Sequence, residues 1–175
     1  MEYRVLHGAR AKGFLTRLFE RYTNPMNWLL KSEPDVFSYS DLEQVGRECW
    51  NGVRNYQARN FLRQMGVGEQ AFFYHSSTAQ PGIVGICEIA RAAYPDNLQF
   101  ESSSDYFDPK STAENVRWSM VDVVPVRGFS LVSLERLRQE SRLENFPLIK
   151  RGNRLSVLPV SDLEWETILE LARSS

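Results

Sequence analysis

Short apolar runs separated by polar turns make up most of the chain, and no hydrophobic period is sustained over a long segment. Runs that are continuous or alternate in steps of two are typical of β-strands, whereas steps of three and four are typical of helices. Strands are predicted over residues 27–31, 69–75, 83–90, 116–126 and 154–160, with a weak one over 98–101. Short strands mixed with short helices predict an α+β domain built on a small, strongly bent sheet.

Capping residues indicate where the helices begin. Residues 40–43 (SDLE) predict a capping box whose helix ends near Gly46, and Asn55 is predicted to cap a helix that Gly66 stops. Further helices are predicted after Ser133, around Leu143 and after Ser161, where SDLE recurs. Residues 95–114 are polar and predict a long loop.

The composition favours a pocket over a broad electrostatic surface. The 175 residues suit one domain, and a net charge of −1 does not predict strong non-specific binding to nucleic acid. Two cysteines, Cys49 and Cys87, are too few for a disulfide framework or a zinc site. No apolar stretch approaches the roughly 18 residues that span a bilayer. We therefore expect a cytoplasmic monomer without metal, cofactor or membrane partner.

Residues 1–25 differ in charge from the rest. They carry five cationic residues against two acidic ones, a net of +3, so the remainder carries −4. Because Met26 lies two residues before the first predicted core residue, we interpret 1–25 as an extension added by an upstream start codon. An ordered accessory helix and a targeting segment are the alternatives. The domain is predicted to span 26–175.

The densest polar segment is 50–60 (WNGVRNYQARN), which holds two aromatics, two arginines, three asparagines and a glutamine. Aromatic rings stack on flat ligands, and amide and guanidinium groups bond their edges, so a nucleobase suits this composition. The alternative interpretation is a glycine turn followed by an ordinary polar helix surface.

Seven short blocks in order carry a family resemblance. They are 28–34 (WLLKSEP), 50–55 (WNGVRN), 74–76 (YHS), 82–85 (GIVG), 108–110 (DPK), 118–123 (WSMVDV) and 154–157 (RLSV). Together they resemble the EVE-domain family over residue 26 to about residue 172. The resemblance implies a PUA-like fold, a small bent mixed β-barrel flanked by short helices, related to the YTH readers of methylated RNA. It also implies binding of DNA or RNA that carries a modified base, most simply a methylated or hydroxymethylated cytosine.

A base pocket needs stacking rings and edge partners, which loops on a rigid scaffold usually supply. Trp50 and Trp118 lie in reader-like blocks and are the predicted rings, whereas Trp28 and Trp165 are assigned to the core. The full set of predicted ligand-binding residues is Lys31, Ser32, Trp50, Arg54, Asn55, Tyr56, Gln57, Arg59, Tyr74, His75, Ser76, Trp118, Asp122 and Arg154, with the arginines assigned to phosphates.

Other interpretations remain beside this one. Ser32 and Asn55 are also suited to helix capping, and the arginines to ion pairs with Asp108 or Asp122. A pocket for a free nucleotide or metabolite is the main alternative. An enzyme using Cys49 and His75 is a weaker one, because no nucleophile motif surrounds the cysteine. Residues 82–85 lack the third glycine of a dinucleotide fingerprint and predict a strand that another backbone approaches closely. We expect a protein that binds and does not catalyse.

Overall fold

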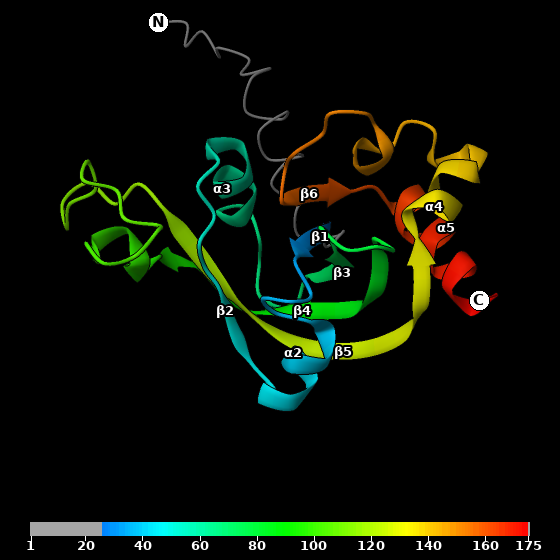
Figure 1. Cartoon of the computed structure of the whole chain (residues 1–175), viewed down its shortest axis with the longest axis horizontal. Helices are drawn as coiled ribbons and strands as arrows, with labels where there is room; N and C mark the ends of the chain where they lie inside the picture. The colour runs from blue at the N-terminus through cyan, green and yellow to red at the C-terminus, as the bar shows by residue number, and fades with distance from the viewer. Residues whose placement is uncertain (1–25, 175) are drawn as a thin grey trace, which may run out of the picture.

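One curved sheet of six strands organises the protein (Figure 1). The computed structural model describes residues 26–174, so the predicted extension 1–25 lies outside the described residues. The strands are β1 (Asn27–Ser32), β2 (Glu48–Trp50), β3 (Gln70–His75), β4 (Gly82–Pro95), β5 (Ser119–Ser133) and β6 (Val157–Val160). Four α-helices accompany them in the described part of the chain: α2 (Tyr39–Val45), α3 (Tyr56–Leu62), α4 (Leu134–Gln139) and α5 (Asp162–Arg173). The predicted α+β class is confirmed.

The strand order is β2-β5-β4-β3-β1-β6. β1 and β3 run parallel and the other neighbours are antiparallel, so the sheet is mixed as predicted. Register shifts interrupt the long β4–β5 pair at four places, and such bulges bend a strand and increase its twist. Within residues 26–174 no pairing joins β2 to β6, so the predicted barrel is an open, strongly bent sheet.

Side-chain caps define the helix starts. Asn55 caps α3 by accepting hydrogen bonds from the N–H groups of Gln57 and Ala58, at 2.9 and 3.0 Å, as predicted. The boxes predicted at 161 and the cap at 133 are also confirmed. The box predicted at residues 40–43 is wrong by two residues. Ser38 is the N-cap, because its side chain and that of Asp41 satisfy each other's backbone N–H.

Several predicted elements differ from the structure, and the first two differ because side chains take over backbone hydrogen bonds. The weak strand predicted over 98–101 is a 3₁₀ turn, η1 (Asn97–Phe100), whose start Asp96 caps. The strand predicted from 116 begins at 119, because the N–H groups of Arg117 and Trp118 donate to the Gln99 side chain instead of a neighbouring strand. α3 ends at Leu62 rather than at Gly66, and the last strand is shorter than predicted.

β1 separates two apolar cores. Trp28 and Leu30 pack on the side covered by α2 and α3, whereas Leu29 packs on the side covered by α4 and α5. Both faces of the strand are therefore buried, which explains its continuous apolar sequence. The remaining short turns, η2 (Ser141–Leu143) and η3 (Pro147–Ile149), close the second core, and η2 matches the helix predicted around Leu143. No helix within 26–174 is long and apolar enough to cross a bilayer.

The block 82–85 forms the start of β4, where another backbone comes close. A Cβ at Gly82 would lie 2.4 Å from the carbonyl oxygen of Val132 on β5. That distance is too short for any side chain, so glycine is required by the strand packing. The predicted close approach is confirmed.

Candidate ligand-binding cavity

A cavity of about 630 Å³ opens where β1 and β2 end and their following loops meet. Its size is within the range of small-molecule and nucleobase sites. It is lined by Lys31, Ser32, Glu33, Val36, Phe37, Glu48, Cys49, Trp50, Asn51, Gly52, Val53, Arg54, Asn55, Tyr106 and Ser156. Five of the predicted ligand-binding residues, Lys31, Ser32, Trp50, Arg54 and Asn55, are thus brought together.

β2 supplies the aromatic wall of the cavity. It pairs with β5 at the edge of the sheet, with Trp50 opposite Val121. The Trp50 ring meets Phe73 of β3 edge-on, with centroids 5.4 Å apart and planes at 90°. This contact ties the ring to the core, while its position in the cavity lining leaves part of it accessible to a ligand.

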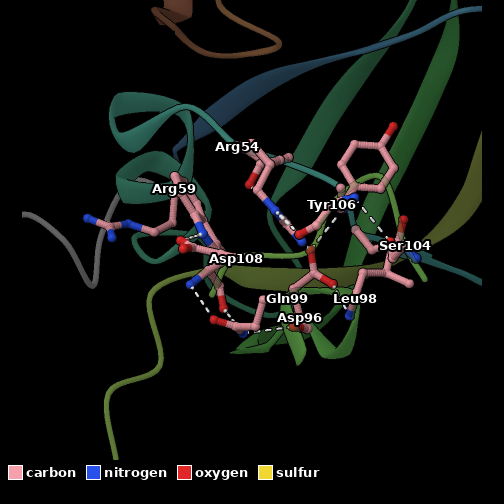
Figure 2. Close-up of polar contacts among 12 residues, drawn as sticks. Arg54, Arg59, Asp96, Leu98, Gln99, Ser104, Tyr106 and Asp108 are labelled. Carbon is pink, nitrogen blue, oxygen red and sulfur yellow. Dashed lines mark hydrogen bonds and ion pairs between the residues drawn. The ribbon is translucent and has the colours of Figure 1, made fainter. Parts of the chain in front are cut away.

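A buried carboxylate holds the loop after β2 in place (Figure 2). Asp96 is fully buried and accepts from the backbone N–H of Gly52 at 2.9 Å, from Nη1 of Arg54 at 2.7 Å and from the N–H of Leu98 at 3.0 Å. Nε of Arg54 also donates to the carbonyl oxygen of Tyr106 at 2.8 Å. The cavity-lining loop is therefore tied to the segment that follows β4.

Gly52 lets Tyr106 complete the wall. Its φ of +73° is a backbone conformation that side chains disfavour, and a Cβ there would lie 3.0 Å from the tyrosine ring. The Arg54 guanidinium carbon lies 5.3 Å from the centroid of the same ring, within cation–π range. The absence of a side chain at Gly52 and the charge of Arg54 together position the Tyr106 ring.

Cationic groups on the cavity wall are only partly neutralised. Burial lowers the pKa of the Lys31 ammonium, which lies 5.8 Å from the centroid of the Tyr74 ring and has no ion-pair partner among residues 26–174. Nη2 of Arg54 is buried and makes no hydrogen bond within the same part of the chain. The unpaired Lys31 ammonium suits a ligand with acceptor atoms, whereas Nη2 of Arg54 is a costly buried donor within the wall.

The second predicted ring, Trp118, lies outside the cavity lining. Its ring stacks on Tyr56 with centroids 4.8 Å apart, and its indole N–H donates to Asp108 at 2.7 Å. The guanidinium carbons of Arg54 and Arg59 lie 5.4 and 5.8 Å from its centroid. Trp118 therefore packs between the cavity residue Arg54 and the arginines beside α3, and its own contact with a ligand stays a prediction.

Three arginines gather beside α3, and we call Arg59, Arg63 and Arg117 the α3 arginine cluster. Arg59 donates to the Asn60 side chain and the Arg117 carbonyl, and Arg63 donates to Ser119 and to backbone carbonyls. Among the described residues neither Arg59 nor Arg63 pairs with a carboxylate, whereas Arg117 pairs with Asp108 at 3.1 Å. Burial, followed by the charge of Arg63, lowers the pKa of Arg59.

The other predicted residues do not line the cavity. The backbone N–H of Tyr39 donates to Nε2 of His75 at 3.1 Å, and burial lowers the pKa of this imidazole. Ser76 donates to the Ser32 carbonyl at 3.3 Å. Tyr74 is buried, and Gln57 and Arg154 are exposed.

Asp122 is held by an ion pair. Arg47 donates to its carboxylate at 2.6 and 3.0 Å, and the Tyr94 hydroxyl donates as well. Burial alone would raise the pKa of Asp122, but these hydrogen bonds outweigh it and hold the pKa below its usual range. Asp122 therefore stabilises the β2–β5 edge of the sheet.

Sequence reasoning missed several members of the lining. Tyr106 lies 50 residues from the aromatic run in a segment predicted only as a polar loop, and no local pattern marks it. Glu48 and Cys49 were missed because three residues are too few to show a strand's alternation. Glu33 could have been predicted as a lining residue, because it directly follows the predicted residue Ser32 in the block 28–34.

The six-stranded mixed sheet with its four helices within the described residues places the protein in the PUA-like fold class. The chain belongs to the EVE domain family, whose sequence profile matches residues 26–171. Human thymocyte nuclear protein 1 is 43% identical over 165 residues, covering 83% of this chain and 73% of the human protein.

Solved structures agree. A Pseudomonas putida protein is 50% identical with a TM-score of 0.82, covering 83% of this chain and 99% of that one. Human thymocyte nuclear protein 1 has been crystallised in complex with DNA containing 5-methylcytosine; it is 41% identical with a TM-score of 0.78, covering 86% of this chain and 99% of that one.

Proposed function

We propose that this protein is a non-catalytic reader of nucleic acid that carries a modified base, with modified cytosine in DNA as the preferred ligand. The observation that carries the proposal is the cavity of about 630 Å³, where the reader-like residues Lys31, Trp50 and Arg54 converge. The human relative's complex with 5-methylcytosine DNA supports DNA as the polymer.

A base inside a duplex cannot reach such a cavity, so the modified nucleotide would be extruded from the stack. Trp50 would support one face of the base, and Tyr106 would close the mouth of the site from the opposite loop. Stacking contributes about 1–3 kcal/mol per base. An added methyl group contributes about 0.8 kcal/mol by burial and up to roughly 3 kcal/mol in a tight pocket. We therefore expect selectivity over plain cytosine of between about fourfold and roughly 150-fold.

The α3 arginine cluster is proposed to hold the backbone beside the extruded base. Arg59 and Arg63 direct their donors to neutral oxygens within 26–174, so their charges are available to phosphates. Arg54 lies between the cavity and this cluster, across the Trp118 ring. The polymer would thus cross α3 while one base enters the cavity.

The absence of catalysis is part of the proposal. A nucleophilic cysteine needs a lowered pKa, whereas burial and the neighbouring Glu48 raise the pKa of the Cys49 thiol. His75, the base of the rival interpretation, accepts a hydrogen bond from the backbone of Tyr39. Both observations favour binding over covalent chemistry.

The decisive experiment is a binding series with oligonucleotides that differ only in one base. Fluorescence anisotropy should show tighter binding to 5-methylcytosine than to cytosine, and mass spectrometry should recover the oligonucleotide unchanged. The free 5-methylcytosine nucleoside, added as competitor, separates a polymer reader from a small-molecule protein. Equal affinity for the nucleoside and the oligonucleotide would contradict the proposal, as would conversion of the base.

Salt dependence tests the role of the arginine cluster. If two or three phosphates are bound, affinity should fall with salt at a log–log slope of roughly −1.5 to −2 for a single strand. Arg63→Gln should reduce that slope by about 0.7, the contribution of one phosphate. Arg173→Gln, at the end of α5, changes the same charge away from the cavity and is the matched control. An unchanged slope in Arg63→Gln would show that Arg63 does not contact a phosphate and would contradict the proposed role of the cluster.

A further inference from the structure

Two pyrimidines that carry the same methyl group differ at one edge of the ring. Cytosine presents an exocyclic amine, a donor, where thymine presents a carbonyl oxygen, an acceptor. A site that distinguishes 5-methylcytosine from thymine therefore needs a hydrogen-bond acceptor at that edge. This acceptor must have a free lone pair. Thymine must leave that lone pair without a hydrogen bond, so that binding of thymine is penalised.

Glu48 meets this requirement. It lines the cavity from β2, two residues before Trp50, so both side chains project from the same face of the strand. Oε1 accepts from the N–H of Cys49 at 3.0 Å and from its thiol at 3.2 Å, which fixes the carboxylate. Oε2 has no hydrogen-bond partner within the described part of the chain. One strand thus offers a stacking surface and a fixed acceptor beside it.

The other acceptors on the wall are less suitable. Glu33 is exposed, and one of its oxygens accepts from the Ser77 hydroxyl at 2.9 Å. The side-chain oxygen of Asn55 is occupied by the cap of α3. Asn51 is exposed and donates its amide to the Cys49 sulfur at 3.3 Å. Glu48 is the half-buried carboxylate among them.

An unpaired donor adds to the match. Beyond the amine, the edge of cytosine presents a ring nitrogen and a carbonyl oxygen, both acceptors. Nζ of Lys31, on the cavity wall, can meet one of them, and it makes no hydrogen bond within residues 26–174. Thymine would instead place its O4 against the carboxylate, with no proton between the two acceptors.

We infer that Glu48 is a specificity residue that selects amino-pyrimidines, so that the site accepts 5-methylcytosine and rejects thymine. The inference rests on the proposed function, because it assumes that a pyrimidine enters the cavity. A carboxylate that accepts from the cytosine amine is an established way of reading this base.

The test uses three oligonucleotides that carry 5-methylcytosine, thymine or cytosine at one position. The wild-type protein should bind the 5-methylcytosine strand at least about tenfold more tightly than the thymine strand. Glu48→Gln should reduce this ratio to within about threefold, because an amide can donate to O4 as well as accept from the amine. Its preference for 5-methylcytosine over cytosine should persist. Glu135→Gln, which removes the same charge from the exposed start of α4 away from the cavity, is the control and should keep the wild-type ratio.

The outcomes separate the two proposals. Equal wild-type affinity for 5-methylcytosine and thymine, both tighter than for cytosine, would overturn the role of Glu48 and leave the reader function standing. A full wild-type ratio in Glu48→Gln would overturn it too. No binding of the wild-type protein to any strand would remove the proposed function and this inference with it. If Glu48→Gln fails to fold, Glu48→Ala is the second variant, and a full wild-type ratio in that variant would likewise overturn the role of Glu48.

Discussion

Trp50 and Trp118 both stand in reader-like blocks and are buried almost equally, at 8% and 5% exposure, yet their surroundings differ. Trp50 borders the cavity and meets Phe73 edge-on. Trp118 is covered by a stacked Tyr56 and bonded to Asp108. One ring meets its aromatic partner edge-on and borders an unfilled cavity, whereas the other is covered by a stacked ring.

The difference comes from residues distant in sequence. Trp118 is enclosed because α3 brings Tyr56 and Arg59 over it, whereas Trp50 borders a cavity whose wall is completed by Tyr106, which packs against Gly52 and Arg54. Burial alone does not separate a binding residue from a structural one. What separates them is whether the neighbouring volume is already filled.

The largest effect should follow removal of the enclosed ring. Trp118→Ala should lower the free energy of unfolding by about 3–5 kcal/mol, because a filled site loses its ring and its hydrogen bond. Trp50→Ala should cost less, since one side of that ring already borders a cavity. Urea unfolding of both variants measures the difference. A larger loss for Trp50→Ala would reverse the assignment.

The next largest effect concerns the carboxylate that anchors the cavity loop. Asp96→Asn keeps the shape but removes the charge that faces Arg54, so we expect a loss of roughly 2–3 kcal/mol in unfolding free energy. Asp105→Asn, an exposed neighbour on the same segment, should have no measurable effect and serves as the control. Equal stability of the two variants would show that the anchor is dispensable.

For binding affinity we expect the reverse of the order predicted for stability: a change at Trp50 should matter more than a change at Trp118. Trp50→Ala should weaken binding to a 5-methylcytosine oligonucleotide by about 1 kcal/mol or more, because a stacking surface is lost. Trp118→Phe, which keeps an aromatic ring beside Tyr56, should leave affinity within about twofold of wild type. Anisotropy titrations on folded variants provide the measurement. The comparison fails if Trp118→Phe loses more affinity than Trp50→Ala.

The smallest effect is a pH dependence of stability that arises from Asp108, the hydrogen-bond partner of the Trp118 indole. Hydrogen bonds from the Lys110 backbone and the Trp118 indole hold the pKa of Asp108 below its ordinary value of 3.8. The folded state thus favours the ionised form, and its contribution is present above pH 3.8 and lost as the pH falls through the lower folded pKa. Urea midpoints should therefore converge for wild type and Asp108→Asn as the solution is acidified. A constant difference between them would argue against this linkage.

The elements with local signals were predictable from sequence. The apolar run of β1 and the caps Asn55, Ser133 and Ser161 depend on neighbouring residues, and all are confirmed. The failures involve distant side chains. Gln99 takes the N–H groups of Arg117 and Trp118, so the strand predicted from 116 begins later.

The candidate site was predictable only where it is contiguous. Residues 31–32 and 50–55 line the cavity because each segment lies at the end of a strand. Tyr106 joins them through its contacts with Arg54 and with the bare backbone of Gly52, which are three-dimensional contacts that no spacing rule reveals. Tyr74, His75 and Ser76 also lie at the end of a strand, but Tyr74 is buried, His75 bonds Tyr39 and Ser76 bonds Ser32.

The bare backbone at Gly52 also makes the width of the cavity adjustable at a single position. A methyl group there would press on the Tyr106 ring and meet an unfavourable φ, so the opposing loop would have to retreat. Enlarging Gly52 would therefore widen the cavity by displacing the Tyr106 ring. The absence of a side chain at Gly52 thus determines where the Tyr106 ring lies, and with it the width of the cavity.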